Sequence, residues 1–294
     1  MTCLLLPDAA QADAPDAASG TLTTLHLPTA LVRPGNGQTT KRDIIIYTPA
    51  GYSAAVNARR RYPVLYLLHG SPGNPNNFIK YGQWPNQMEN LVKQGGTVPA
   101  IMVMPNGNYA GQKEGDSEWA DSADRRDRFE TWVTQEIVPY IDSHYRTKAS
   151  ASGRILAGVS EGGFGSVNLA LRNPRLFGGA VGLSGYYDMR GFGWGHIIMN
   201  DSDAAMSLNS PLFYVPEKTQ SGHIPPEWRT MRVFVGAGEE EKPYAQETRS
   251  IGAALQKAGV SQVQVSTPNG KHDWNLWTSL FLAGLRFTLP ANGS

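Results

Sequence analysis

Short apolar segments that alternate with amphipathic ones constrain the fold of this chain more than any other feature. Two of them, 62–70 (YPVLYLLHG) and 99–107 (PAIMVMPNG), are continuously apolar and end at glycine, as strands buried on both faces of a sheet do. Further strands are predicted within 42–52, 153–160, 177–185, 231–238 and 261–270. Helical spacing predicts helices within 86–95, 128–145, 162–174, 247–259 and 274–289, with a kink near Pro139 in the second.

This alternation predicts an α/β fold with a mostly parallel, doubly wound sheet and helices on both faces. In such sheets the active site lies outside the carboxyl ends of the strands. The segment 186–230 breaks the alternation and is rich in glycine, proline and aromatic residues. We therefore predict a single domain over residues 21–294, with 186–230 as an irregular insertion that covers the active-site edge.

Composition excludes several classes of partner. The net charge is +1, which gives no reason to expect nucleic acid or an anionic membrane surface. No apolar run approaches the roughly 18 residues that a membrane-spanning helix needs. Cys3 is the only cysteine, and no histidine and carboxylate residues have metal-ligand spacing, so neither a metal nor another cofactor is expected.

The first 20 residues are not expected to belong to the folded domain. They contain a short apolar stub followed by an Ala-x-Ala pattern at Ala10 and Ala12, which is typical of the end of a signal peptide. The stub lacks a basic start and is shorter than usual, so a disordered tail rich in alanine, aspartate and proline is the alternative. The first interpretation favours export and the second is compatible with a cytoplasmic protein, so the compartment stays open.

Ser160 is the strongest candidate for a reactive residue. It lies in AGVSEGGFGS, between Gly158 and Gly162, where a predicted strand runs directly into a predicted helix. A Gly-x-Ser-x-Gly match alone is weak, but the strand–turn–helix context is what a nucleophile elbow requires. Side chains at the two glycines would collide with the neighbouring strand and helix. We therefore predict that Ser160 is a nucleophile.

A serine nucleophile needs a base, and the elbow architecture places the acid and then the histidine after it in the sequence. Three histidines follow Ser160: His196 and His223 in the predicted insertion, and His272 in NGKHDWNLW. His272 follows a late strand, so it should lie at the same sheet edge as the elbow. We predict His272 as the base.

The acid and the oxyanion donors are expected in two other loops. Glu239, Glu240 and Glu241 follow the strand in MRVFVGAG, and one of them could orient the histidine. The backbone N–H of Glu161, directly after the nucleophile, and that of Ser71, after the strand in LLHGSPGN, are the predicted oxyanion donors. The sequence pattern alone does not choose among the three glutamates.

Several motifs together resemble those of the putative-esterase family of α/β-hydrolases, which includes esterase D, feruloyl esterases and the antigen 85 mycolyltransferases. The resemblance covers about residues 40–290 and is carried by YPVLYLLHGSPGNPNNF, MPNGN, ETWVTQEIVPYIDSHYRT, AGVSEGGFGSVNLALRNPRLFGGAVGLSG and NGKHDWNLW. It implies an α/β-hydrolase fold with Ser160 as nucleophile and His272 as base. It also favours Glu241 as the acid, three residues after Gly238, with Glu239 selected if Gly236 is aligned instead.

Four side chains near this site have open interpretations. Glu161 either points into the fold and pairs with an arginine or a hydroxyl, or faces the pocket and binds a cationic group of the substrate. Trp194 and Tyr186 either line an acyl or lipid pocket or belong to the core of the insertion. Trp119 matches a position that borders the pocket in the resembled family.

These observations predict a cofactor-free serine carboxylesterase that acts on a small-molecule or lipid-like ester through an acyl-enzyme. One alternative is an acyltransferase of the antigen 85 type, which differs only in the second acceptor. The other is a non-catalytic binding protein on the same fold. The sequence does not identify the natural ester or the oligomeric state.

Overall fold

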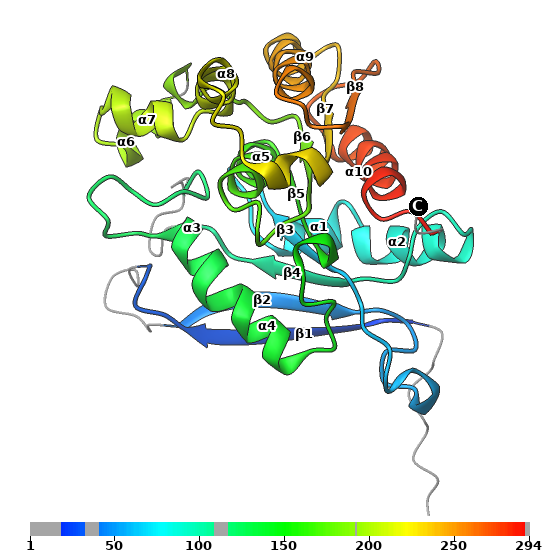
Figure 1. Ribbon diagram of the computed structural model, residues 1–294. Helices are drawn as coiled ribbons and strands as arrows, with labels where there is room; N and C mark the ends of the chain where they lie inside the picture. The colour runs from blue at the N-terminus through cyan, green and yellow to red at the C-terminus, as the bar shows by residue number, and fades with distance from the viewer. Residues whose placement is uncertain (1–18, 33–40, 109–116, 192, 292–294) are drawn as a thin grey trace, which may run out of the picture.

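The computed structural model describes residues 19–32, 41–108, 117–191 and 193–291. Within these residues one sheet has the strand order β1-β2-β4-β3-β5-β6-β7-β8 (Figure 1). The strands are β1 (Thr21–Pro28), β2 (Lys41–Thr48), β3 (Val64–Leu68), β4 (Ile101–Pro105), β5 (Arg154–Val159), β6 (Gly179–Leu183), β7 (Arg232–Gly236) and β8 (Gln262–Ser266). β2 is antiparallel to β1 and β4, and all other pairs are parallel. The predicted mostly parallel sheet is confirmed.

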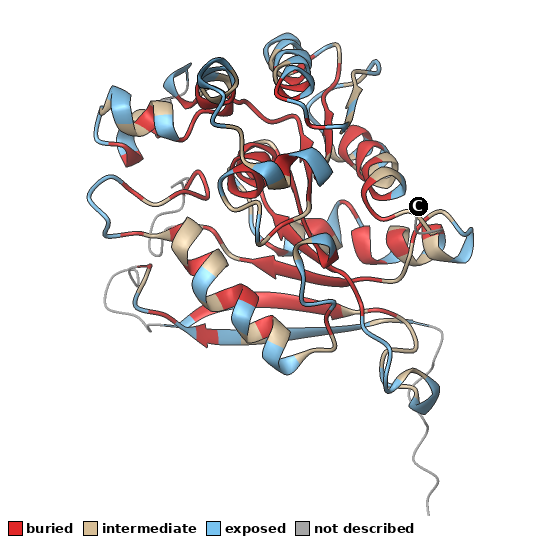
Figure 2. Ribbon diagram, in the orientation of Figure 1, coloured by how far each residue is buried: buried red, intermediate tan, exposed pale blue. Residues whose placement is uncertain are grey.

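The central strands are buried on both faces, which explains their uninterrupted apolar sequences (Figure 2). In β3, Val64, Tyr66 and Leu68 contribute to the apolar cluster on one face, and Leu65 and Leu67 contribute to the cluster on the other. This division follows from the alternation of side chains along a strand. Each face therefore needs its own layer of helices.

Helices cover both faces of the sheet (Figure 1). One layer consists of α1 (Asn76–Lys80), α2 (Trp84–Lys93) and α10 (Trp274–Thr288). The other consists of α3 (Phe129–Trp132), α4 (Val138–His144), α5 (Glu161–Arg172), α8 (Pro211–Ser221) and α9 (Lys242–Lys257). Short 3-10 turns, η1 (Ala55–Asn57) and η3 (Ala151–Gly153), lie in the connections. In the described part of the chain, no helix combines the length and apolar character needed to cross a bilayer.

A π-helical stretch precedes Pro139, where the sequence predicts a kink. α3 and α4 are joined without a loop by η2 (Val133–Ile137), which ends two residues before Pro139. Proline has no N–H to donate to the carbonyl four residues earlier, so a wider turn ahead of it relieves the conflict.

The prediction of an irregular segment over 186–230 is wrong in its local structure. The segment contains η4 (Met189–Gly191), α6 (Gly193–Ile198), α7 (Asp203–Leu208), α8 and η5 (Pro226–Thr230). Two of its proline and glycine residues mark helix ends: Pro211 opens α8 and Gly222 closes it with φ of 73°. The segment packs through Met189, Ile198 and other apolar residues on Phe164, in the first turn of α5.

Candidate active site

Ser160 lies on the turn between β5 and α5. Its backbone has φ of 55° and ψ of −120°, a conformation that residues other than glycine rarely adopt. The Ser160 N–H donates to Leu183 O at 2.8 Å, and the Phe164 N–H donates to Ser160 O at 3.0 Å. These bonds fix the turn between the neighbouring strand β6 and the start of α5.

The two glycines that flank Ser160 lie where no side chain fits. A Cβ at Gly158 would lie 2.2 Å from Gly162 O, and a Cβ at Gly162 would lie 1.9 Å from Leu68 O. The sequence predicts this crowding, and it allows β3, β5 and α5 to meet closely around the serine.

The imidazole of His272 forms hydrogen bonds on both sides. Its Nε2 lies 3.1 Å from Ser160 Oγ, and its Nδ1 lies 2.5 Å from Glu241 Oε2. His272 is in the loop between β8 and α10, and the next residue, Asp273, caps α10 by accepting the N–H groups of Asn275 and Leu276. The alcohol, imidazole and carboxylate thus form one continuous row, the arrangement needed to take a proton from a serine hydroxyl.

The three neighbouring glutamates have different environments. The side chain of Glu241 is buried, with 4% of its surface exposed. Glu239 pairs with Arg249 at 2.6 Å, and Glu240 lies 3.8 Å from Lys271; both carboxylates are open to solvent. Only Glu241, among the three, contacts His272.

Sequence reasoning does not single out Ser184, Trp277 or Tyr244, which also adjoin this row. The fully buried Ser184 donates its hydroxyl to Glu241 Oε1 at 2.6 Å, and Trp277 Nε1 donates to Ser184 Oγ at 2.9 Å. The rings of Tyr244 and Trp277 lie 4.7 and 4.8 Å from the His272 ring. One signal for Ser184 is available in the sequence: a polar residue directly follows a buried strand, as Ser160 does.

The loop after β3 contacts the serine turn. A Cβ on Gly70 would lie 2.9 Å from Ser160 Cβ, so the backbone leading to Ser71 runs beside Ser160. Glu161 begins α5, where the first N–H groups are not used by the helix itself. The N-terminal end of a helix also favours negative charge. The two predicted oxyanion donors therefore come from segments that adjoin Ser160.

The side chain of Glu161 is buried, and Ser117 Oγ donates to its Oε1 at 3.2 Å. This is the first of the two interpretations given above, in which Glu161 points into the fold and pairs with a hydroxyl. Its carboxylate is thus held by Ser117 inside the fold.

The aromatic residues predicted to bind substrate have little exposed surface. Trp119 is fully buried and donates its indole N–H to His69 O at 3.0 Å. Tyr186 is 5% exposed, stacks on Phe164 with ring centroids 5.1 Å apart, and donates its hydroxyl to Glu118. Both support the loops around the site in this structure, and the side chain of Trp194 lies outside the described residues.

His69 holds the loop after β3 as a neutral imidazole. Its Nε2 accepts the Gly107 N–H at 2.9 Å, which leaves the ring proton on Nδ1 to donate to Gly70 O at 3.0 Å. The Trp119 ring packs against it at 5.2 Å. Burial lowers the pKa of His69 to about 4, because the charged form loses its hydration.

This burial should make the fold sensitive to acid. The pKa of His69 falls from an ordinary 6.5 to about 4 on folding, so the unfolded chain binds more protons between these values. Stability is therefore complete above about pH 6.5 and lost as the pH falls toward 4, by about 3 kcal/mol for this group. Urea unfolding of the protein at a series of pH values measures the slope.

The variant His69→Gln should flatten that slope, because glutamine retains hydrogen-bonding groups but does not titrate. His223→Gln, at an exposed position, is the matched control and should keep the wild-type pH dependence. Equal slopes in wild type and His69→Gln would contradict the assignment.

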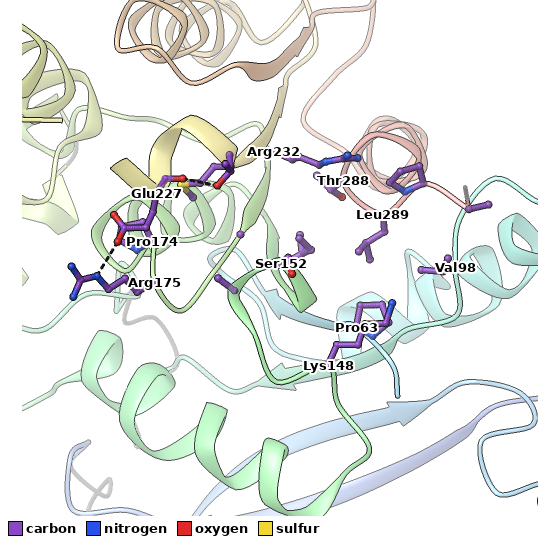
Figure 3. A pocket seen from close by; sticks show the side chains of 17 residues that line it. Pro63, Val98, Lys148, Ser152, Pro174, Arg175, Glu227, Arg232, Thr288 and Leu289 are labelled. Carbon is purple, nitrogen blue, oxygen red and sulfur yellow. Dashed lines mark hydrogen bonds and ion pairs between the residues drawn. The ribbon is translucent and has the colours of Figure 1, made fainter. Parts of the chain in front are cut away.

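The structure also contains a cavity of about 750 Å³, whose lining residues are drawn in Figure 3. It lies at the end of the sheet where the parallel strands begin. Its lining includes residues that precede or begin β3, β5, β6 and β7, namely Pro63, Ser152, Gly178 and Arg232. None of Ser160, His272 and Glu241 lines it. The cavity is therefore not part of the candidate active site.

The family profile and the similar proteins with known names all point to esterases. The sequence profile of the family described as Putative esterase matches residues 36–288. The chain is 29% identical over 233 residues to an endo-1,4-beta-xylanase/feruloyl esterase of Xylanibacter ruminicola, covering 79% of this chain and 27% of that protein. It is 30% identical over 193 residues to an esterase of Mycobacterium tuberculosis, covering 63% of this chain and 40% of that protein. The chain thus spans less than half the length of these two relatives.

Solved structures share the fold over nearly the whole chain. A ferulic acid esterase superposes with a TM-score of 0.72 at 25% identity, covering 93% of this chain and 99% of that one. An S-formylglutathione hydrolase of Staphylococcus aureus superposes with a TM-score of 0.71 at 16% identity, with the same coverage. Because the family profile matches most of the sequence, the chain belongs to the Putative esterase family of hydrolases that act on ester bonds.

Proposed function

We propose that this protein hydrolyses carboxylic esters through an acyl-enzyme formed on Ser160, with His272 as the base and Glu241 as the acid that orients it. The observation that carries the proposal is the hydrogen-bonded row from Ser160 Oγ through His272 to Glu241, with distances of 3.1 and 2.5 Å. Family membership supports the reaction class.

In this mechanism Ser160 Oγ attacks the acyl carbon and its proton passes to His272 Nε2. The carbonyl oxygen becomes an oxyanion, which the backbone N–H groups of Ser71 and Glu161 stabilise. His272 then gives its proton to the departing alkoxide, which leaves as an alcohol. Water attacks the acyl-enzyme in the second half and loses a proton to His272. The bond between Ser160 Oγ and the acyl carbon then breaks, His272 returns the proton to Oγ, and the carboxylic acid leaves.

Glu241 has two parts in this scheme. It accepts the Nδ1–H of His272, which keeps Nε2 available to receive the serine proton. Its negative charge then stabilises the imidazolium that forms in the transition state. The short contact and the burial of this carboxylate support both parts.

For the substrate, we propose esters of ferulic acid or related hydroxycinnamic acids. The support is the likeness to two proteins named for this activity, the xylanase/feruloyl esterase and the ferulic acid esterase structure. The aromatic rings of Tyr244 and Trp277 beside His272 are compatible with an aromatic acyl group near the reacting atoms.

Two measurements test these proposals separately. A fluorophosphonate probe should label the wild-type protein on Ser160 and leave Ser160→Ala unlabelled. With p-nitrophenol as the common leaving group, kcat/KM for the feruloyl ester should exceed that for the butyryl ester by about tenfold or more. Failure to label Ser160 contradicts the serine-hydrolase mechanism, whereas labelling without acyl preference contradicts only the substrate class.

A further inference from the structure

We infer that Ser184 is a positioning residue for the proposed reaction: its hydroxyl holds the Glu241 carboxylate in the orientation that His272 requires. The inference rests on the proposed function and adds to it a second hydrogen-bonding layer, in which Trp277 orients Ser184. The ends of β6 and β7 and the helix α10 contribute to this layer, so no local sequence motif contains it.

The direction of each hydrogen bond in this layer follows from the donor types. An indole N–H can only donate, so Trp277 gives its proton to Ser184 Oγ across 2.9 Å. With that interaction made, the single proton of Ser184 is directed to Glu241 Oε1, 2.6 Å away. An ionised carboxylate can only accept, which matches this arrangement.

The two carboxylate oxygens of Glu241 consequently have separate tasks. Oε1 accepts from the Ser184 hydroxyl and from the Gly238 N–H, at 2.6 and 2.5 Å. Oε2 faces His272 Nδ1 at 2.5 Å. A glutamate side chain has one more rotatable bond than an aspartate side chain, so its carboxylate has more freedom to turn. The two hydrogen bonds to Oε1 restrict that freedom more than one hydrogen bond would.

Ser184 is itself held rigidly and away from solvent. Its N–H donates to Gly236 O at 2.6 Å, its φ is 48°, and its surface is fully buried. Because bulk water does not reach the position, the loss of the hydroxyl would leave both Glu241 Oε1 and the indole N–H short of a partner.

Ser184→Ala tests the inference. A hydrogen bond to a charged group contributes enough that kcat for ester hydrolysis should fall about 10- to 100-fold, with KM changed less than about threefold. The rate of fluorophosphonate labelling should fall by a similar factor, because it depends on activation of Ser160. Ser166→Ala is the matched control: Ser166 is equally buried, but among the described residues its hydroxyl bonds to the backbone carbonyls of Gly163 and Val181 and to no side chain.

A double-mutant cycle separates positioning from general damage. If Ser184 acts through Glu241, then Ser184→Ala should cost less than about threefold when introduced into Glu241→Gln. The same 10- to 100-fold loss in both backgrounds would overturn the inference, since the effect would not pass through Glu241. A wild-type rate in Ser184→Ala, or an equal loss in Ser166→Ala, would also overturn it.

Trp277→Phe provides a second test that retains the serine. It removes the indole N–H but keeps an aromatic ring beside His272, so kcat should fall about 3- to 10-fold in the wild-type background and less than about twofold in Glu241→Gln. If Ser184→Ala does not fold, as judged by circular dichroism, this cycle decides the question alone, and equal losses in the two backgrounds overturn the inference. An active, unlabelled Ser160→Ala would instead contradict the proposed function itself, which keeps the two failures distinct.

Discussion

Replacing Ser160 or His272 with alanine should lower kcat/KM for ester hydrolysis by about 10⁶-fold, and replacing both should cost no more than either change alone. The reason is that the nucleophile and its base act as a unit: without the imidazole the serine keeps its proton, and without the serine the imidazole has nothing to activate. The 3.1 Å contact between the two side chains is the structural basis of this coupling.

The measurement is steady-state hydrolysis of one p-nitrophenyl ester by the two single variants and the double variant. Circular dichroism should show that all three are folded, since His272 is in a loop and Ser160 contributes a single oxygen. A double variant slower than either single variant by several orders of magnitude would mean that the two residues act independently, which contradicts the mechanism.

Glu241→Gln should lower kcat by about 10⁴-fold with a small effect on KM. The amide is nearly the same size as the carboxylate, but it carries no charge to stabilise the imidazolium, and its NH₂ group can impose the wrong histidine tautomer. Glu241 is buried and 2.5 Å from His272 Nδ1, so solvent does not compensate for the change.

Glu239→Gln and Glu240→Gln are matched controls because they make the same chemical change on adjacent residues. Their carboxylates are exposed and pair with Arg249 and Lys271, and surface pairs of this kind contribute little. Both variants should keep kcat within about threefold of wild type. A large loss in either, with an active Glu241→Gln, would transfer the role of the acid to that neighbour.

The sequence predicts the sheet well because its central strands are buried on both faces and therefore carry uninterrupted apolar runs. The edge strand β1 is not predicted: most of its residues are exposed, so no apolar run marks it. Helices α6 and α7 escape prediction because each has only six residues, and α6 also contains Gly193 and Gly195, a residue type that is typical of loops.

The candidate site also contains residues that the sequence predicts and residues that it does not. Ser160 and His272 have local signals, a strand–turn–helix motif and a loop after a late strand. The resemblance to the family favours Glu241, but no local pattern separates it from Glu239 and Glu240. In the structure these two neighbours pair with Arg249 and Lys271, whereas Glu241 turns inward to Ser184, 57 residues away in the sequence. Ser184 and Trp277 are 93 residues apart, and only the folded sheet brings them together.

The pairing of β6 with β7 keeps the candidate active site independent of the long segment that joins these two strands. β6 and β7 pair directly, with Leu183 opposite Gly236, although α6, α7 and α8 lie between them in the sequence. The part of this segment that follows Ser184 thus begins and ends beside adjacent strands, so its length can change without altering the spacing of Ser160, Glu241 and His272. Evolution or an engineer could exchange this part as a unit, while the side chains proposed to react stay in register on the sheet.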